Sequence, residues 1–388
     1  MTIDFGLSKE QLDIQKAVRE FANAEFTKDY ILELELGHKF PFELWKKACD
    51  LGFIAIDYPE EYGGQGYNLL ERVLVTEEFC RQGGGVGNSL MLSNFGCKLI
   101  LKHGSEEQKR KYLIPACQGE AISWAAFTEP DRGSDLVTFP LSTTSVRTNN
   151  GSYLINGTKT FITNATIASF GTVLCQTDFQ AKPPYRGQSI MIVERDLDGV
   201  EVTEWAKMGM NYSPTTDLSL KNVRVSQENL LGEENRGFYY AMEFLNEVRI
   251  EIGAMGVGIA QGAFDRALNY SRARTAFGRK IGEFQAISHK LAEMATKIET
   301  ARLLAYKAAF EFDNGTAGSK VCSMAKWYSA RVAVEVADEA IEILGGHGYM
   351  LENEVERFYR DAKSLELVEG TREIHKNIIA RNLLGRLS

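Results

Sequence analysis

The sequence has little proline, and none of it lies in the C-terminal part. Eight prolines occur among 388 residues, and none follows Pro214. Because proline removes a backbone donor and breaks the interior of a helix, a long stretch without it is typical of long helices. We therefore expect the C-terminal part of the chain to be helical.

Cysteine pairs, long apolar runs and an excess of basic residues are also lacking. The six cysteines include no CxxC pair, and no histidine cluster has metal-ligand spacing, so we expect a reduced protein without a metal site. No apolar run approaches the ~20 residues that cross a bilayer, and the start lacks a signal-peptide pattern. We expect no membrane span and a cytoplasmic location. A formal net charge of −8 argues against non-specific binding to nucleic acid.

The residues present are those of an ordinary globular protein, with 44% apolar and 25% charged, and the length suggests two or three domains. The first third reads as helical. Ser8 and Gln11 form a capping box before an apolar stripe of Leu12, Val18, Phe21 and Phe26. The glycine-containing stretches 59–66 and 83–87 are predicted loops.

From about Ala121 the pattern changes to short β-type runs. The pairs Asn150-Gly151 and Asn156-Gly157 predict turns between strands. After Gly232 the apolar period becomes helical, with two long helices joined near Asn314-Gly315. The preceding helix, near 237–272, has small residues that permit close backbone approach: Gly253, Gly256, Gly258 and Gly262.

We therefore predict a multi-domain α+β protein. Its expected parts are an N-terminal helical domain at 1–120, a middle β-barrel-like or sandwich domain at 121–231, and a C-terminal four-helix bundle at 232–388.

Five collinear segments carry a resemblance to a known family: AAFTEPDRGSD at 125–135, TKTFITNA at 158–165, RTAFGRKIGEFQ at 274–285, EILGGHGYM at 342–350 and RDAKSLELVEGTREIH at 360–375. In this order, within a helix–β–helix chain, they resemble the FAD-dependent acyl-CoA dehydrogenase family over essentially the whole length. The resemblance implies the acyl-CoA dehydrogenase fold and an oxidoreductase that removes hydrogens from the α and β carbons of an acyl-CoA thioester.

The resemblance also implies flavin-binding residues in the middle domain. The 127–134 loop offers hydroxyls and amides without a charge, which suits hydrogen bonding to a flavin edge. Phe127 and Thr128 would touch the isoalloxazine, and Ser134 would lie where FAD and CoA meet. Phe161, Ile162 and Thr163 would back the ring, although such an alternation is by itself more typical of a strand core.

A second set of residues is implied to bind FAD across a subunit interface. The guanidinium of Arg274 matches paired phosphate oxygens, although a basic run is otherwise typical of a solvated face. In the family this arginine, with the counterparts of Phe277 and Gln285, reaches the FAD of a neighbouring subunit. The implied assembly is a homo-oligomer, usually a tetramer. Gly345 and Gly346 would approach the same cofactor, whereas Glu342 replaces the usual glutamine and either turns toward a ribose hydroxyl or loses the contact.

Glu369 is the residue that matches the family's catalytic base, and burial would raise the pKa of its carboxyl. Some relatives place the base on the earlier helix, where this chain has Val248. The resemblance further places Asn246 and Arg249 near the CoA portion, with a hydrogen bond within the helix as the alternative. It brings Gly370 close to the substrate, and Thr371 and Glu373 to the flavin.

The residue before the base bears on the acyl group. Val368 replaces a frequent tyrosine, which leaves room for a branched, cyclic or aryl-bearing chain. Gly87 stands where glutaryl-CoA dehydrogenases have an arginine, which makes a glutaryl substrate improbable. The implied electron acceptor is an electron-transfer flavoprotein. An acyl-CoA oxidase, an enoyl-CoA reductase or a non-catalytic flavin- or CoA-binding scaffold are the alternatives.

Overall fold

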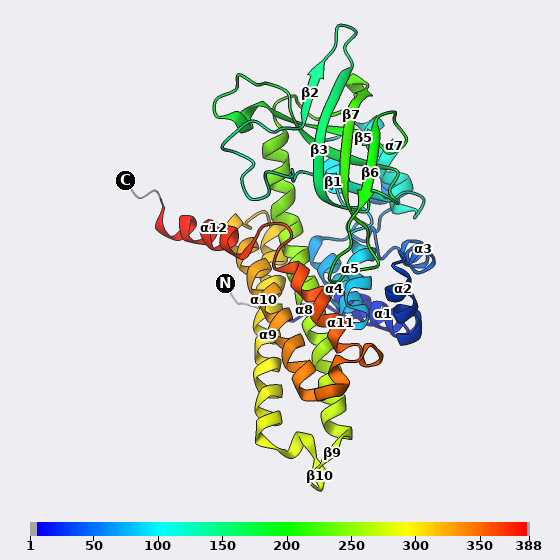
Figure 1. Cartoon of the computed structure of the whole chain (residues 1–388), viewed down its shortest axis with the longest axis vertical. Coiled ribbons are helices and arrows are strands. Elements are labelled where there is room, and N and C mark those ends of the chain that lie inside the picture. Colours follow the sequence, from blue (N-terminus) through cyan, green and yellow to red (C-terminus); the bar gives the residue numbers. More distant parts are fainter. Residues whose placement is uncertain (1–5, 386–388) are drawn as a thin grey trace.

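The computed structural model describes residues 6–385, with helices at both ends of the chain and a sheet between them (Figure 1). Ser8 and Gln11 form the expected capping box at the start of the first helix. The N-terminal helices are α1 (Lys9–Glu25), α2 (Lys28–Gly37), α3 (Phe42–Asp50), α4 (Leu69–Gly83), α5 (Gly85–Met91), α6 (Cys97–His103) and α7 (Glu106–Cys117), with a 3-10 turn, η1, at Glu60–Tyr62.

Two details of this part differ from the sequence-based prediction. The 83–87 stretch is not a loop, because Gly83 ends α4 and Gly85 begins α5, so only Gly84, at φ 58°, interrupts the helices. An added Cβ at Gly85 would lie 2.6 Å from a carboxylate oxygen of Asp361, so glycine is required by packing. Leu12 is 51% exposed and does not belong to the buried stripe.

The middle part is an eight-stranded sheet in the order β6-β7-β3-β2-β4-β5-β8, with β1 parallel to β4. The Asn150-Gly151 turn joins β2 to β3, but Asn156-Gly157 lies inside β3, where the register with β7 shifts. An added Cβ at Gly157 would lie 2.5 Å from the Cα of Thr143, so this glycine permits a close approach of two strands. The strands are β1 (Ser123–Ala126), β2 (Thr144–Arg147), β3 (Tyr153–Thr163), β4 (Phe170–Gln176), β5 (Gln188–Glu194), β6 (Val200–Glu204), β7 (Thr215–Val225) and β8 (Leu230–Leu231), and 3-10 turns lie at η2 (Pro184–Gly187) and η3 (Gln227–Asn229).

The proline-free part begins with β7 and β8 and is mainly helical from Gly237 onward, as predicted for the C-terminal part. Its helices are α8 (Gly237–Ala273), α9 (Gln285–Asp313), α10 (Ser319–Leu344), α11 (Val355–Leu365) and α12 (Arg372–Leu384). A small hairpin of β9 (Thr275–Ala276) and β10 (Arg279–Lys280) follows α8, and 3-10 turns lie at η4 (Ile281–Glu283), η5 (Gly345–Tyr349) and η6 (Leu351–Asn353).

Close backbone contacts around α8 explain its glycines. An added Cβ at Gly256 would lie 2.8 Å from the backbone of Ser329 on α10, and one at Gly262 would lie 2.1 Å from the carbonyl oxygen of Arg81 on α4. Helix α8 therefore packs directly against α4, α9, α10 and α11. The fold class expected from the sequence is confirmed.

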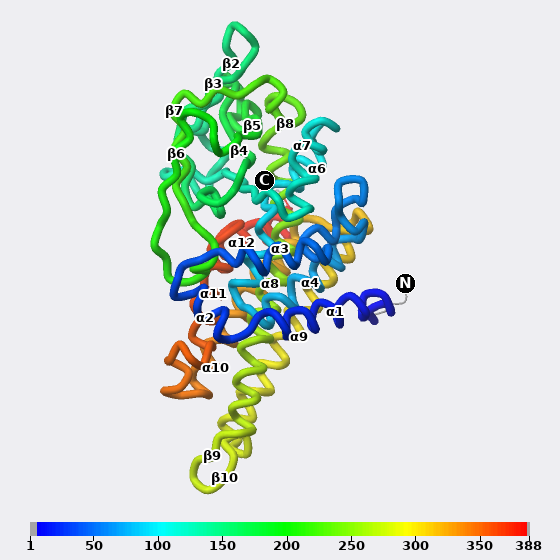
Figure 2. The backbone as a smooth tube through the Cα atoms, turned by 90° about the vertical axis from the view of Figure 1, so that its right-hand side faces the viewer, coloured from blue at the N-terminus to red at the C-terminus, as the bar shows by residue number. Residues whose placement is uncertain are grey.

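The long helix α8 connects the two ends of the molecule. It begins beside the sheet and ends at the β9–β10 hairpin at the opposite end, as Figures 1 and 2 both show. No helix among residues 6–385 combines the length and apolar character needed to cross a membrane.

Candidate active site

Glu369 lies in the short connection between α11 and α12, in a backbone conformation that is unusual for its residue type. Its φ is 53° and that of Gly370 is 110°. Two buried cations bind the carbonyl groups of this turn: Arg249 Nε donates to the Glu369 carbonyl (3.4 Å) and Lys326 Nζ to the Gly370 carbonyl (2.7 Å). A left-handed non-glycine residue is strained and persists only when its surroundings hold it. Helices α8 and α10 thus fix the turn that carries Glu369.

The surroundings of Glu369 make its carboxylate more basic than one in water. Burial raises the pKa of the Glu369 carboxyl, and the charges of Arg249 and Lys326 oppose that rise only in part. Burial also lowers the pKa of Lys326 to about 7. A carboxylate whose pKa is raised is a stronger base than one in water.

Residues Asn246 and Arg249 lie on one face of α8, next to this turn. Arg249 Nη1 donates to Asn246 Oδ1 (3.1 Å), so the hydrogen bond within the helix that the sequence left as an alternative does form. Val248 is buried, and Glu247 is paired with Lys102 Nζ (2.8 Å) away from the Glu369 turn. Glu247, the carboxylate next to Val248, is therefore engaged by a cation of α6.

Two residues of the cluster escaped the sequence analysis. Lys326 is 1% exposed on α10, and His375 is 0% exposed on α12 with burial lowering the pKa of its ring to about 3. An added Cβ at Gly370 would lie 3.1 Å from Nε2 of His375, so the ring closes one side of the turn. The available signal was Lys326, the one charged residue between Val321 and Ala330 in the second helical run.

A buried ion pair fixes the 127–134 loop. Lys159 and Glu129 are both 0% exposed and lie 3.0 Å apart, and Lys159 Nζ also donates to the carbonyl of Phe127 (3.0 Å). The ring of Phe127 meets that of Phe244 on α8 in a T-shaped contact at 6.0 Å. Through these contacts the loop is attached to α8, two residues before Asn246.

The other predicted flavin residues of the middle domain differ in exposure. Phe161 is 68% exposed at φ 57°, whereas Ile162 is buried, so the aromatic ring is not part of the strand core. Thr128 is half-buried, with its carbonyl accepting from the Thr160 amide (3.0 Å), and Ser134 is exposed. An exposed ring in a strained conformation beside a buried strand offers a flat apolar surface for a ligand.

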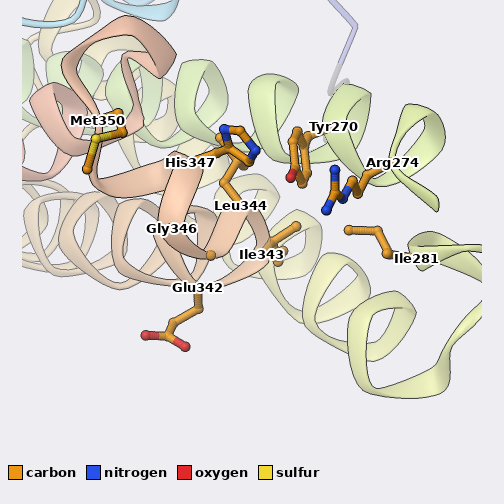
Figure 3. A pocket seen from close by; sticks show the side chains of 10 residues that line it. Tyr270, Arg274, Ile281, Glu342, Ile343, Leu344, Gly346, His347 and Met350 are labelled. Atoms are coloured by element: carbon orange, nitrogen blue, oxygen red, sulfur yellow. The ribbon is translucent and has the colours of Figure 1, made fainter. Parts of the chain in front are cut away.

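A separate pocket lies at the hairpin end of α8. Arg274, Glu342, Gly345 and Gly346 line it together with Tyr270 and His347. The guanidinium of Arg274 donates to no acceptor among residues 6–385, and Cβ atoms added to either glycine would meet nothing within 4 Å. Figure 3 shows Glu342 pointing away from Arg274. An unpaired guanidinium beside open glycine backbone fits the pyrophosphate of a dinucleotide such as FAD.

Phe277 and Gln285 lie within four residues of Ile281, which lines this second pocket. Phe277 is 96% exposed on the hairpin, and Gln285 is the exposed first residue of α9. Arg249 and Arg274 are 25 residues apart on the same helix (274 − 249), which at about 1.5 Å per residue separates them by about 37 Å. One chain therefore presents two separate groups of candidate residues along α8.

Models of known protein families match almost the whole length of the chain. Three family models match in succession: acyl-CoA dehydrogenase, N-terminal domain at 8–120, middle domain at 125–223 and C-terminal domain at 235–384.

Individual relatives agree with this result. The chain is 40% identical to the 3-(aryl)acrylate reductase of Clostridium sporogenes, over 96% of this chain and 97% of that one. It is 38% identical to caffeyl-CoA reductase-Etf complex subunit CarC of Acetobacterium woodii, over 98% and 99%. The solved structure of butyryl-CoA dehydrogenase from Megasphaera elsdenii superimposes with a TM-score of 0.93 at 34% identity, covering 98% of this chain and all of the other. The chain belongs to the acyl-CoA dehydrogenase family, whose members are FAD-dependent oxidoreductases acting on acyl-CoA thioesters.

Proposed function

We propose that this protein catalyses α,β-dehydrogenation of an acyl-CoA thioester to the 2-enoyl-CoA, with Glu369 as the base that removes the α-proton. The observation that carries the proposal is the turn at Glu369 and Gly370, whose two carbonyl groups accept hydrogen bonds from buried cations. Glu369 is held in a left-handed conformation by Arg249 and Lys326, and burial raises the pKa of its carboxyl. A raised pKa matches a carboxylate to proton abstraction near neutral pH.

The same turn offers a donor for the thioester oxygen. The backbone N–H of Glu369 donates to no acceptor within the described part of the chain. A free amide next to the base stabilises negative charge as it develops on the carbonyl oxygen of the substrate. FAD, when bound, supplies the acceptor for the β-hydrogen and its electron pair. Asn246, Arg249, Val368, Gly370 and Ser134 are the proposed substrate contacts.

We infer that each FAD is held by two subunits. The proposed residues of one chain are Phe127, Thr128, Ser134, Phe161, Ile162, Thr163, Thr371 and Glu373, and those of a neighbour are Arg274, Phe277, Gln285, Glu342, Gly345 and Gly346. The separation of about 37 Å along α8 supports this, because the pyrophosphate and the flavin of one cofactor cannot contact both groups of candidate residues in one chain. Phe277, Phe310 and Leu383 expose apolar surface for subunit contacts. The proposed assembly is a homotetramer.

The proposed substrate carries a branched, cyclic or aryl-bearing acyl chain. Val368 is smaller than a tyrosine and leaves width beside the α-carbon. An arginine for a distal carboxylate is excluded at Gly87, where an added Cβ would lie 2.4 Å from the Phe79 backbone. Two of the relatives are named for aryl acrylate and caffeyl-CoA substrates, which supports the aryl class.

The reverse reaction is the second candidate, because these two relatives are named reductases. We propose an electron-transfer flavoprotein as the redox partner in either direction, since CarC is named as a subunit of a complex with Etf.

The proposed location is the cytoplasm. All six cysteines are buried free thiols, as in proteins of reducing compartments, which supports this location.

The proposed domain limits are 1–120, 121–231 and 232–388. They are supported by the change from helix α7 to strand β1 and from strand β8 to helix α8.

Anaerobic bleaching of the bound flavin by a panel of straight, branched, cyclic and aryl acyl-CoAs tests this function. We expect bleaching by at least one member and fast transfer to electron-transfer flavoprotein. Glu369→Gln should keep the yellow colour and bleach about 10²–10⁴-fold more slowly. Equally fast bleaching by Glu369→Gln would show that the base is elsewhere. Rapid reoxidation by air alone would identify an oxidase, and reoxidation by enoyl-CoAs but no bleaching by acyl-CoAs would identify a reductase.

A further inference from the structure

Lys326 is a buried cation with a single hydrogen-bond acceptor. The side chain is 1% exposed on α10, and among residues 6–385 its ammonium donates only to the carbonyl of Gly370, at 2.7 Å. Burying an ammonium with one neutral acceptor costs free energy unless nearby charge compensates. The position of such a group next to the turn of Glu369 therefore requires an explanation.

The geometry links Lys326 to the conformation of the base. Gly370 directly follows Glu369, and the two residues have φ values of 110° and 53°. The Gly370 carbonyl belongs to the peptide plane between Gly370 and Thr371, so its bond to Lys326 fixes the backbone immediately after Glu369 and limits how that turn can rotate. Arg249 on α8 binds the preceding carbonyl, that of Glu369, and thereby fixes the peptide plane that directly follows Glu369.

The titratable groups around Lys326 come from every element that packs on it. The charged ones are Arg249 on α8, Glu366 after α11 and Glu369 in the turn. Two further titratable groups are uncharged near neutral pH: the thiol of Cys322 on α10 itself and the ring of His375 on α12. Glu366 is already paired with Lys363 at 2.5 Å and faces Arg331 and Arg372. Glu369 is thus the acid whose ionised form Lys326 chiefly stabilises.

We propose that Lys326 is a positioning residue for the reaction: its ammonium holds the Gly370 carbonyl, keeps Glu369 in its left-handed conformation and supplies positive charge that stabilises the carboxylate. This rests on the proposed role of Glu369 as the base. The charge is present below about pH 7 and is lost above it, because burial lowers the pKa of the ammonium to about 7.

Two variants separate the two parts of this role. Lys326→Met removes both the donor and the charge, and Lys326→Gln keeps a donor without the charge. We expect Lys326→Met to slow anaerobic flavin bleaching on the order of 100-fold, as a misplaced catalytic group does, and Lys326→Gln to recover part of the loss. Both should raise the apparent pKa of the pH–rate profile, because each removes positive charge near Glu369. Lys320→Met, at an exposed position of the same helix, should match the wild type.

A purely structural role predicts another pattern: lower unfolding temperatures and less bound FAD, with the pH–rate profile of the remaining enzyme unchanged. That result, or wild-type rates in both variants, overturns the proposal. If Lys326→Met does not fold, an unchanged profile in Lys326→Gln overturns it alone. Glu369→Gln is measured in parallel. If it bleaches normally, the proposed base is wrong; if it fails to bleach while the Lys326 variants behave as wild type, only the role of Lys326 is wrong.

Discussion

Two arginines on α8 lie in opposite environments, Arg249 in the half nearer the sheet and Arg274 at the hairpin end. Arg249 is 6% exposed and donates to Asn246 and to the Glu369 carbonyl. At the hairpin end, Arg274 is exposed and its guanidinium has no acceptor within the described residues. The side chain of Arg249 is paired within its own chain, whereas that of Arg274 is open to the exposed pocket at the hairpin end. Burial and pairing therefore distinguish the proposed catalytic turn, which is held within one chain, from the proposed FAD-binding residues of the hairpin end, which stay exposed.

Of the substitutions that test this comparison, Arg274→Ala is expected to have the largest effect, a loss of FAD binding. Because Arg274 holds no partner in its own chain, its loss should leave the unfolding temperature nearly unchanged while weakening FAD binding by about 100-fold or more, the value of charge-assisted hydrogen bonds. Ultrafiltration followed by flavin absorbance measures the FAD retained. Arg272→Ala, an exposed arginine two residues earlier, is the matched control. Full FAD retention by Arg274→Ala would contradict the proposed pyrophosphate site.

Two glycines sharpen the contrast between packed and open backbone. Gly262→Ala would place a Cβ 2.1 Å from the Arg81 carbonyl oxygen, and we expect a loss of about 1–3 kcal/mol in the free energy of unfolding. Gly346→Ala meets no atom within 4 Å and should change stability by less than about 0.5 kcal/mol, yet weaken FAD binding. Urea unfolding of the apoprotein and FAD titration measure the two effects. Equal destabilisation by both substitutions would refute this distinction.

His375, which packs against the Glu369 turn, should make the free energy of unfolding depend on pH. Its folded pKa, lowered to about 3, lies below the ordinary value of 6.5, so the unfolded chain binds more protons between these limits. Stability is therefore present above pH 6.5 and is lost as pH falls, by up to about 1.4 kcal/mol per pH unit.

Urea unfolding between pH 7.5 and about 4 should show a flatter pH dependence for His375→Gln than for the wild type. His289→Gln, at an exposed position on α9, should keep the wild-type slope. An unchanged slope in His375→Gln would mean that other groups cause the acid sensitivity.

The smallest effect is expected from Asn246→Ala. The substitution removes the acceptor of one Arg249 hydrogen bond, worth about 1 kcal/mol, which corresponds to roughly a fivefold slower flavin bleaching. Stopped-flow absorbance with a saturating acyl-CoA measures this rate. Asn269→Ala, at an exposed position near the hairpin end of α8, serves as the control, and equal rates in the two variants would remove Asn246 from the site.

Local patterns in the sequence were sufficient for most of the fold. The absence of proline after Pro214 predicted α8 to α12, and Ser8 with Gln11 predicted the first cap, because both depend on neighbouring residues alone. The pair Asn156-Gly157 was wrongly predicted to be a turn. An Asn-Gly pair is typical of a hairpin turn, but here the glycine is needed because the backbone of Thr143 lies close to it, and the sequence alone does not distinguish the two cases. The glycines at 83–87 were misread for a similar reason, since Asp361 lies far away in sequence.

The sequence by itself determined the order of helical and β segments, the family resemblance and the identity of Glu369 as the candidate base. Only the tertiary structure decided which residues surround that base. Lys326 and His375 contact the turn from two different helices, α10 and α12. A contact between residues on different helices leaves no trace in the spacing of apolar residues along the sequence. The separation of Arg274 from Glu369 was likewise decided by the uninterrupted length of α8, because a rigid helix fixes how far apart its two ends lie.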